Sequence, residues 1–357
     1  MLGLIIAGAG IGASKMIEHR KKKKEERKRR EEIVGGRKLD SEPLPVFFWS
    51  HGGPSFMDPD AEFGGNPGAY KKVQEIGNYV RGNGVVKFII IVSGHWESEA
   101  LNSIEVAVPT QSSPVQKSPD SPPSYEEATK TTLENSLIYD FYNFPARYYQ
   151  EQFHSRCDVD VANKIVERIN RSESDLNARS VSRGLDHGAW VPLKVAFPRG
   201  KTDDYWNLDV PVIQVSLPAG ESFSKSYELG RILASFRTMG GLIIGSGMSV
   251  HNLSDLRSFT PGAAPRSYVS QFNKLIKNII SSPREKGSKL AQFEKIKRDS
   301  DSNKLLHAAH PSLDHFLPLL VSLGAGEGIS SPSQFCAREL YNYNDYSMGW
   351  GLYEFGV

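Results

Sequence analysis

Cysteine is scarce in this sequence of 357 residues: only Cys157 and Cys336 occur, and no CxxC spacing is present. Two isolated cysteines argue against a disulfide-rich secreted fold and against a thiolate zinc site. The sequence also has no GxSxG, Walker or HExxH motif, so it lacks the usual signals of serine hydrolases, P-loop NTPases and zincin metalloproteases. We therefore expect a protein of a reducing compartment, the cytoplasm.

A long apolar run is also missing. The apolar opening MLGLIIAGAGIGA gives way to a run of Lys and Arg within residues 15–30. A transmembrane helix needs roughly 20 apolar residues, and a secretory signal places its basic residues before the apolar ones. We expect residues 1–40 to be an apolar and basic extension that either contacts an anionic membrane surface or remains a solvated helical tail.

Neither sign of charge dominates, because the formal net charge is +2. The cations are concentrated in the N-terminal extension, and the remainder of the chain is mildly acidic. No nucleic-acid partner is therefore expected. The length and the hydrophobic content of 39% are sufficient for a large buried core.

Strand-like apolar runs alternate with amphipathic helical patterns from Pro45 onward, which is typical of a parallel sheet covered by helices. The strand-like runs span 45–50, 85–94, 103–108, 210–218 and 241–247, and the helical patterns span 70–81, 159–170, 224–236 and 267–280. The sequence thus predicts an α/β fold with a central, mostly parallel sheet flanked by helices. We expect one catalytic domain over residues 41–357.

One segment interrupts this alternation. Residues 109–132 are rich in Ser, Pro and Thr and poor in apolar residues, which predicts a disordered surface insertion. The insertion contains PPSY, whose Pro122, Pro123 and Tyr125 match the peptide form that WW domains bind. A WW-domain partner and a plain linker are both compatible with so short a motif.

Three histidines follow strand-like runs almost at once: His51, His95 and His251. In open α/β sheets the ligand crevice lies outside the carboxyl ends of the strands, so we expect these imidazoles to converge there. Three neutral imidazoles are the donor set of a divalent transition-metal site. Glu97, two residues beyond His95, is a further candidate ligand or an acceptor that orients an imidazole. Unrelated loop histidines are the alternative.

Two more histidines are candidates for catalysis. His187 lies in a glycine-flanked segment, DHGAW, and an imidazole titrates near neutral pH, as general acid/base work requires. His315 directly precedes the apolar run FLPLLVSL, so we expect it at the first turn of a helix. Aromatic residues beside these motifs, Trp96, Trp190 and Phe316, either form a wall of the site or belong to the core.

The motifs HGGPSFM, SGHWE, DHGAWVPL, GSGMSVHNL and HPSLDHFLPL occur in an order that resembles the class III extradiol ring-cleavage dioxygenases, in the branch of the 4,5-DOPA dioxygenases. The resemblance extends from Pro45 to the C-terminus. It implies a metal held by His51, His95 and His251, a catalytic acid/base at His187 and a substrate-contacting residue at His315.

The resemblance further implies Fe(II) or Zn(II) as the cofactor, and a catechol-type substrate with O2, DOPA being one candidate. An alternative is a zinc-binding relative with altered catalysis, because Zn(II) cannot pass electrons to O2. A second alternative is an adaptor or scaffold that acts through PPSY and the basic extension.

Overall fold

The structure is a computed structural model that describes residues 43–61, 64–109, 132–198, 205–260, 262–282, 289–329 and 336–356. All of them belong to the compact unit Pro43–Val357. The N-terminal extension at 1–40 and the PPSY motif lie outside the described residues, as does nearly all of the insertion at 109–132. What the sequence predicts for these segments therefore stays a prediction.

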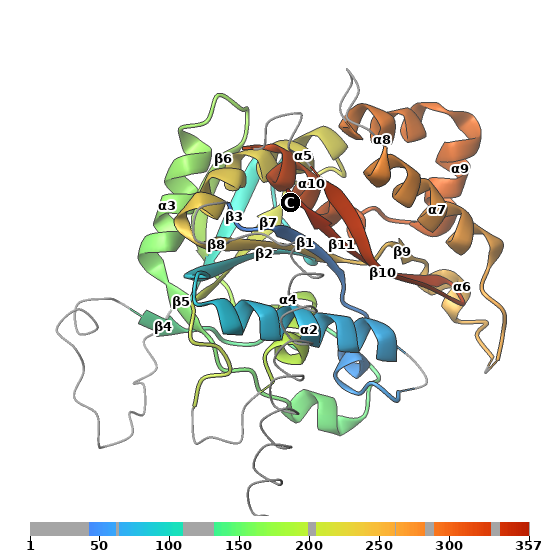
Figure 1. Ribbon diagram of the computed structural model, residues 1–357, viewed down its shortest axis with the longest axis horizontal. Helices are drawn as coiled ribbons and strands as arrows, with labels where there is room; N and C mark the ends of the chain where they lie inside the picture. Colours follow the sequence, from blue (N-terminus) through green and yellow to red (C-terminus); the bar gives the residue numbers. More distant parts are fainter. Residues whose placement is uncertain are drawn as a thin grey trace, which may run out of the picture. The chain divides into compact units, whose positions relative to one another are not determined.

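The centre of the fold is one large sheet with the strand order β10-β11-β1-β8-β2-β7-β3-β6, in which the short β9 pairs with β11 (Figure 1). A separate ladder joins β4 and β5. The strands are β1 Val46–Ser50, β2 Phe88–Glu97, β3 Ser103–Val108, β4 Thr132–Glu134, β5 Arg156–Asp158, β6 Asn177–Ser182, β7 Val212–Leu217, β8 Gly241–Gly247, β9 Val250–His251, β10 Ala337–Asp345 and β11 Met348–Phe355.

The middle of this sheet is parallel, because β1, β8, β2 and β7 run in one direction. Its margins are not: β11 is antiparallel to β1, and β3 is antiparallel to β7. The predicted parallel α/β sheet is therefore confirmed, with antiparallel additions that the sequence did not reveal.

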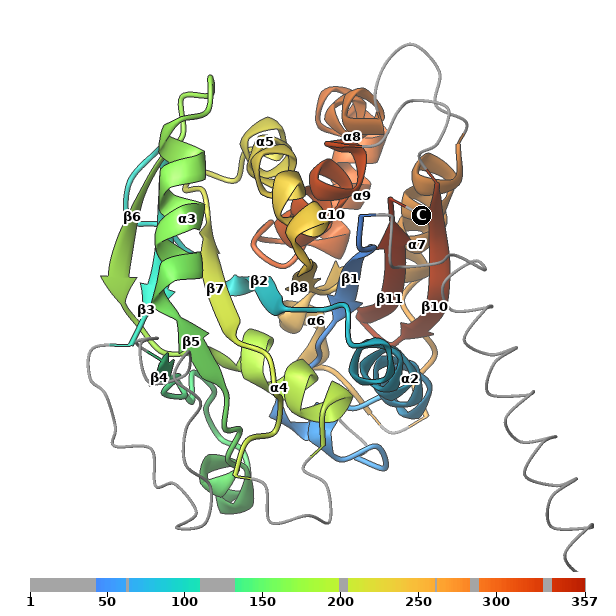
Figure 2. The same cartoon turned by 60° about the vertical axis from the view of Figure 1, so that its left-hand side comes forward.

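Helices cover both faces of the sheet. In both views α2 and α4 lie on one side, while α5 and α10 lie on the other with α7, α8 and α9 beyond them (Figures 1 and 2). The helices are α2 Pro67–Asn83, α3 Val159–Asn170, α4 His187–Ala196, α5 Phe223–Leu233, α6 Leu253–Leu256, α7 Ser267–Ser281, α8 Lys289–Arg298, α9 Ser300–Ala309 and α10 Leu317–Glu327. Short 3-10 turns span Pro54–Met57, Ala146–Gln150 and Ala234–Met239.

The strands in the middle of the sheet read as continuous apolar runs because both of their faces are buried. Every residue of β1, β7 and β8 is buried, and so is every residue of α10. Such a helix, apolar on all sides, is stable only inside a core. In the part of the chain that the structure describes, no helix combines the length and the apolar character that crossing a membrane requires.

Candidate functional site

The site lies where three neighbouring strands end. His51 follows β1 directly, His95 lies in β2 two residues beyond its last pairing with β8, and His251 ends β9, which follows β8. Because β1, β8 and β2 are adjacent and parallel, their carboxyl ends meet at one edge of the sheet. The strand topology thus brings residues that are far apart in the sequence to one place.

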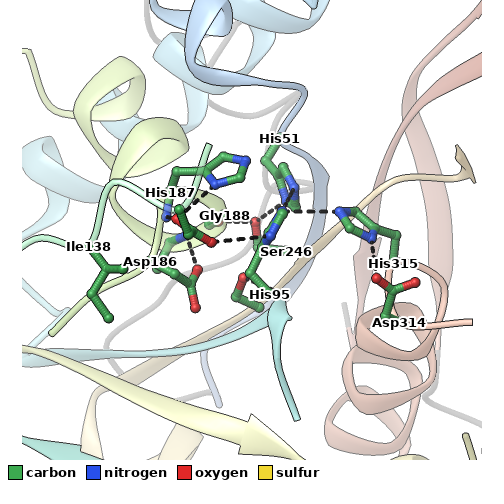
Figure 3. A network of polar contacts seen from close by, with 12 residues as sticks. His51, His95, Ile138, Asp186, His187, Gly188, Ser246, Asp314 and His315 are labelled. Carbon is green, nitrogen blue, oxygen red and sulfur yellow. Dashed lines mark hydrogen bonds and ion pairs between the residues drawn. The ribbon is translucent and has the colours of Figure 1, made fainter. Parts of the chain in front are cut away.

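The imidazole nitrogens of three histidines converge at this edge. His95 Nε2 lies 3.2 Å from His51 Nε2 and 3.1 Å from His315 Nε2. One ligand nitrogen from each of these side chains falls within 4.8 Å of the others. Figure 3 shows His315 on one side of His51 and His187 on the other.

The remaining ring nitrogens are held by oxygen atoms. His51 Nδ1 lies 3.0 Å from Ser246 Oγ, whose hydroxyl proton is donated to the carbonyl of Gly188. The serine oxygen is therefore left to accept from the imidazole, so Nδ1 of His51 carries the proton. His315 Nδ1 lies 3.0 Å from Asp314 Oδ2, and an ionised carboxylate can only accept.

Asp140 holds the Nδ1 atoms of two histidines at once. Its Oδ1 lies 2.9 Å from His187 Nδ1, and its Oδ2 lies 3.3 Å from His95 Nδ1. Burial raises the pKa of Asp140, but the hydrogen bonds from His187 and His95 prevail and lower it, so the carboxylate is ionised. Both imidazoles therefore carry their protons on Nδ1 and present bare Nε2 atoms.

The lone pairs on Nε2 of His51, His95 and His315 consequently face one another without a hydrogen between them. Lone pairs directed into one small volume repel unless a cation lies between them. Neutral imidazoles with fixed Nδ1–H groups are the donor set of a divalent metal, and oxygen atoms that orient such ligands are usual around metal sites. The residues present therefore fit Fe(II) or Zn(II).

Burial keeps most of these imidazoles neutral. It lowers the pKa of His51 well below its ordinary value, and the neighbouring histidines lower it further. Burial also lowers the pKa of His251 and of His315. For His95 burial acts in the same direction, but its carboxylate partners prevail and raise the pKa. A metal binds neutral imidazole, so burial prepares the site for it.

His251 lies directly behind the converging nitrogens. Its ring stacks on His315, with ring centroids 3.7 Å apart and an interplanar angle of 11°. These two histidines form a further possible ligand group with Asp314. The structure thus brings all five predicted site histidines together. The resemblance implied His251 as the third metal ligand beside His51 and His95, whereas in the structure the nitrogen that lies within 4.8 Å of theirs belongs to His315.

His187 is the first residue of α4. Asp186, its neighbour in sequence, caps this helix by accepting from the backbone N–H of Ala189 and contacts Gln214. The partner of the His187 imidazole is therefore the distant Asp140 rather than the adjacent Asp186. Asp140 lies in an irregular stretch after β4 within the sequence YDFYNF, which carries no motif that could have singled it out.

Two glycines permit the close packing of these side chains. A Cβ on Gly188 would lie 2.3 Å from Ser93 Oγ and 2.7 Å from His95 Cδ2, and a Cβ on Gly247 would lie 2.1 Å from the carbonyl oxygen of His315. Any larger residue at these positions would displace an imidazole.

The histidine cluster opens into a cavity of about 760 Å³. Among its lining residues are His95, His187, His251 and His315. Its aromatic lining consists of Phe141, Tyr142, Phe144, Phe259, Tyr346 and Trp350. A cavity of this size and mixed character is suited to a small organic molecule.

The structure bears on two further expectations. Glu97 is not in a metal-capable group among the described residues; it accepts a hydrogen bond of 2.6 Å from the backbone of Gly220. Trp96, Trp190 and Phe316 are buried and do not line the cavity, which matches their alternative role in the core.

Comparisons with known proteins identify the family of this chain. The family model described as the catalytic LigB subunit of aromatic ring-opening dioxygenase matches residues 45–348. A 4,5-DOPA dioxygenase extradiol-like protein of Schizosaccharomyces pombe is 29% identical over 301 residues, covering 79% of this chain and 85% of that protein. A 4,5-DOPA dioxygenase extradiol of Beta vulgaris is 27% identical over 312 residues, covering 87% and 96%.

A solved structure of an uncharacterized protein from Escherichia coli K12 has the same fold, with a TM-score of 0.58 and 20% identity over 87% of this chain and 99% of that one. The family model extends over most of the chain and over all five site histidines. The chain therefore belongs to the LigB family of aromatic ring-opening dioxygenases and is an enzyme of that class.

Proposed function

We propose that this enzyme is an extradiol dioxygenase that opens the ring of a catechol-type substrate, DOPA-like molecules included. The observation that carries the proposal is the convergence of bare Nε2 atoms from His51, His95 and His315 beside an open cavity. The reaction breaks the carbon–carbon bond next to one hydroxyl-bearing carbon and places both atoms of O2 in the product. The ring supplies the electrons, so no external reductant is needed.

The metal would be held by His51 and His95 together with one imidazole of the stacked pair His251 and His315. The family resemblance assigns His251 to the metal and His315 to the substrate. When bound, Fe(II) supplies the redox chemistry that O2 requires, and Zn(II) does not. The relatives named as 4,5-DOPA dioxygenases support a catechol as the substrate class.

His187 is the proposed general acid/base. Its Nδ1–H is fixed by Asp140, so Nε2 is the atom free to take a proton from a catechol hydroxyl and to return it as the ring opens. Burial and the neighbouring His95 lower the pKa of His187, and Asp140 offsets this only in part. The imidazole is therefore neutral at neutral pH and available as a base. Phe141 packs edge-on against it, with ring centroids 5.6 Å apart, and limits its rotation.

The test is anaerobic reconstitution of the metal-free protein with Fe(II) or with Zn(II), followed by measurement of oxygen uptake and of the yellow semialdehyde with a set of catechols. Uptake with Fe(II) and not with Zn(II) is expected. Stoichiometric binding of both metals without uptake for any catechol would refute ring cleavage and favour the zinc-bound alternative.

The metal set is tested separately by the metal content of His251→Gln and His315→Gln. We expect one of the two variants to lose the metal and the other to retain it with a higher KM. Loss of metal in neither variant would place the site elsewhere. The WW-domain partner and the membrane contact of the N-terminal extension stay predictions.

A further inference from the structure

The cavity beside the histidines carries charge of one sign. Its lining contains four carboxylates, and none of the described residues that line it is Lys or Arg. Asp140 and Asp314 are held by imidazoles, as described above. Glu97 and Asp345 remain, and Glu97 accepts a backbone hydrogen bond at Gly220.

Asp345 is placed rigidly against the proposed metal site. It is the last residue of β10 and pairs with Met348, which in turn pairs with His251. The tip of this hairpin is fixed by two hydrogen bonds between Ser347 and Asn252, of 2.8 and 3.3 Å. The backbone position of Asp345 relative to the metal site is thus set by strand pairing rather than by a flexible loop.

No ion pair joins Asp345 to a cation within the described part of the chain. Burial raises its pKa, and the nearby indole of Trp350 and backbone of Tyr346 lower it only in part. Arg266 lies near the same hairpin. Its guanidinium donates to the Tyr346 hydroxyl at 2.7 Å, pairs with Asp255 at 3.7 Å and lies over the Tyr346 ring, 4.9 Å from its centroid. Tyr346 therefore already has a cationic partner, and the rings left for a substrate ammonium are those of Phe259 and Trp350.

The part of the cavity that Asp345 lines also contains aromatic rings. Phe259 and Tyr346 both line the cavity, with ring centroids 5.4 Å apart, and Trp350 lines it beside them. A carboxylate next to aromatic faces attracts an ammonium group by charge and by cation–π interaction. A substrate carboxylate at this place would instead meet like charges, and no described residue that lines the cavity is a Lys or Arg that could pair with it.

From this arrangement we propose that the enzyme selects catechols whose side chain ends in a cationic amine, and that Asp345 is the residue that receives the amine. This inference rests on the proposed function and names the substrate class of the same site. DOPA carries an ammonium and a carboxylate together, so an amine that lacks the carboxylate is the better substrate.

The test compares catechols with side chains of similar length and different charge: 3,4-dihydroxyphenethylamine, the neutral 4-ethylcatechol and the anionic 3,4-dihydroxyphenylacetate. With the Fe(II)-loaded enzyme kcat/KM should fall in that order. A hydrogen bond to a charged group is worth roughly tenfold in an equilibrium. In Asp345→Asn the ratio of kcat/KM for the amine over the neutral catechol should therefore fall by about tenfold.

Anaerobic titration calorimetry with the same molecules gives Kd values without turnover, and the same order is expected. Asp255→Asn is the matched control, because this carboxylate near the hairpin does not line the cavity. This variant should leave unchanged the preference for the amine over the neutral catechol, both in kcat/KM and in Kd. Thermal unfolding of each variant identifies a loss of folding, and Asp345→Glu should restore part of the preference.

Oxygen uptake without preference for the amine would overturn the inference and leave the proposed function intact. Loss of the preference in Glu97→Gln rather than in Asp345→Asn would overturn the assignment to Asp345. Tighter anaerobic binding of the amine that depends on Asp345, combined with no uptake of O2, would support the inference and count against ring cleavage.

Discussion

Two regions enclose the active-site cavity, and they differ in how the chain builds them. The floor consists of the histidines at the strand ends: His95 and His251, which line the cavity, and His51, whose Nε2 lies 3.2 Å from His95 Nε2. The wall consists of the segment that carries Asp140 and of the β10–β11 hairpin that carries Asp345. The floor supplies imidazoles from the ends of the parallel strands β1 and β2 and from β9, which follows β8 and pairs antiparallel with β11. The wall supplies carboxylates from the margin of the sheet and from an irregular segment.

The order of the strands gathers the histidines, whereas side-chain hydrogen bonds between distant parts of the chain orient their rings. Parallel neighbours must end at one edge, so strand order alone gathers the floor. Nothing in the strand order brings Asp140 to His187, which lies 47 residues away in sequence. The floor therefore gathers imidazoles that fit a metal, and Asp140 of the wall fixes which ring nitrogen is bare in His95 and His187.

The largest effect is expected for His51→Ala, which removes a histidine of the floor. This change removes one of the converging Nε2 atoms, so metal binding and oxygen uptake should both be lost. The expected loss exceeds the roughly 10- to 100-fold effects seen when residues that orient metal ligands are changed. Metal analysis and oxygen electrode measurements check it. His307→Ala, at an exposed histidine, is the matched control and should keep both properties.

The pH dependence of the free energy of unfolding tests the role of His310, a buried histidine that contacts the segment before His251. His310 is fully buried, packs against Phe272 and Phe316, and lies 2.9 Å through Nε2 from the carbonyl of Ser249, two residues before His251. Burial lowers its pKa from 6.5 to about 4; the bond to Ser249 raises it in part. The charge on nearby Asp314 raises the pKa, and His315 and His307 lower it.

A depressed histidine pKa means that the unfolded state binds the proton more tightly. The contribution of neutral His310 is therefore fully present above pH 6.5 and is lost as the pH falls toward about 4, by about 3 kcal/mol. Urea unfolding at several pH values should show this loss in the wild type and a smaller one in His310→Gln. Parallel pH curves for the two proteins would contradict the assignment.

Asp140→Asn replaces the carboxylate of the wall and leaves every histidine of the floor unchanged. An amide cannot accept from both imidazoles through two oxygens, so His187 loses its fixed orientation. We expect a decrease of roughly 10- to 100-fold, mainly in kcat rather than in KM, with the metal retained. Asp58→Asn removes a surface carboxylate paired with Arg147 and is the control. An unchanged kcat would show that Asp140 does not orient the base.

The smallest effect is expected for Glu97→Gln, which tests whether the floor also includes a carboxylate ligand. Because Glu97 bonds to Gly220 and not to a histidine, the metal content should be unchanged. A clear loss of metal in this variant would add Glu97 to the floor.

Much of the fold could be predicted from periodicity. All five predicted strands and all four predicted helical segments occur, with boundaries that differ by a few residues. The sequence did not reveal the short strands β4, β5 and β9, nor β6 and the β10–β11 hairpin. β6 is largely exposed and β10 is half-buried, so neither carries the apolar run that marks a strand in the middle of the sheet.

The sequence by itself predicted that His51, His95 and His251 gather at one place, because apolar strands that end in histidine converge at one edge of a parallel sheet. That the nitrogen of His315 joins those of His51 and His95 emerged only in the structure. Only the tertiary structure decided how the imidazoles are oriented. Asp140 and Ser246 hold ring nitrogens of residues far away in sequence. A hydrogen bond depends on distance in space, and no local periodicity encodes which carboxylate of a long chain will come within 3 Å of a given imidazole.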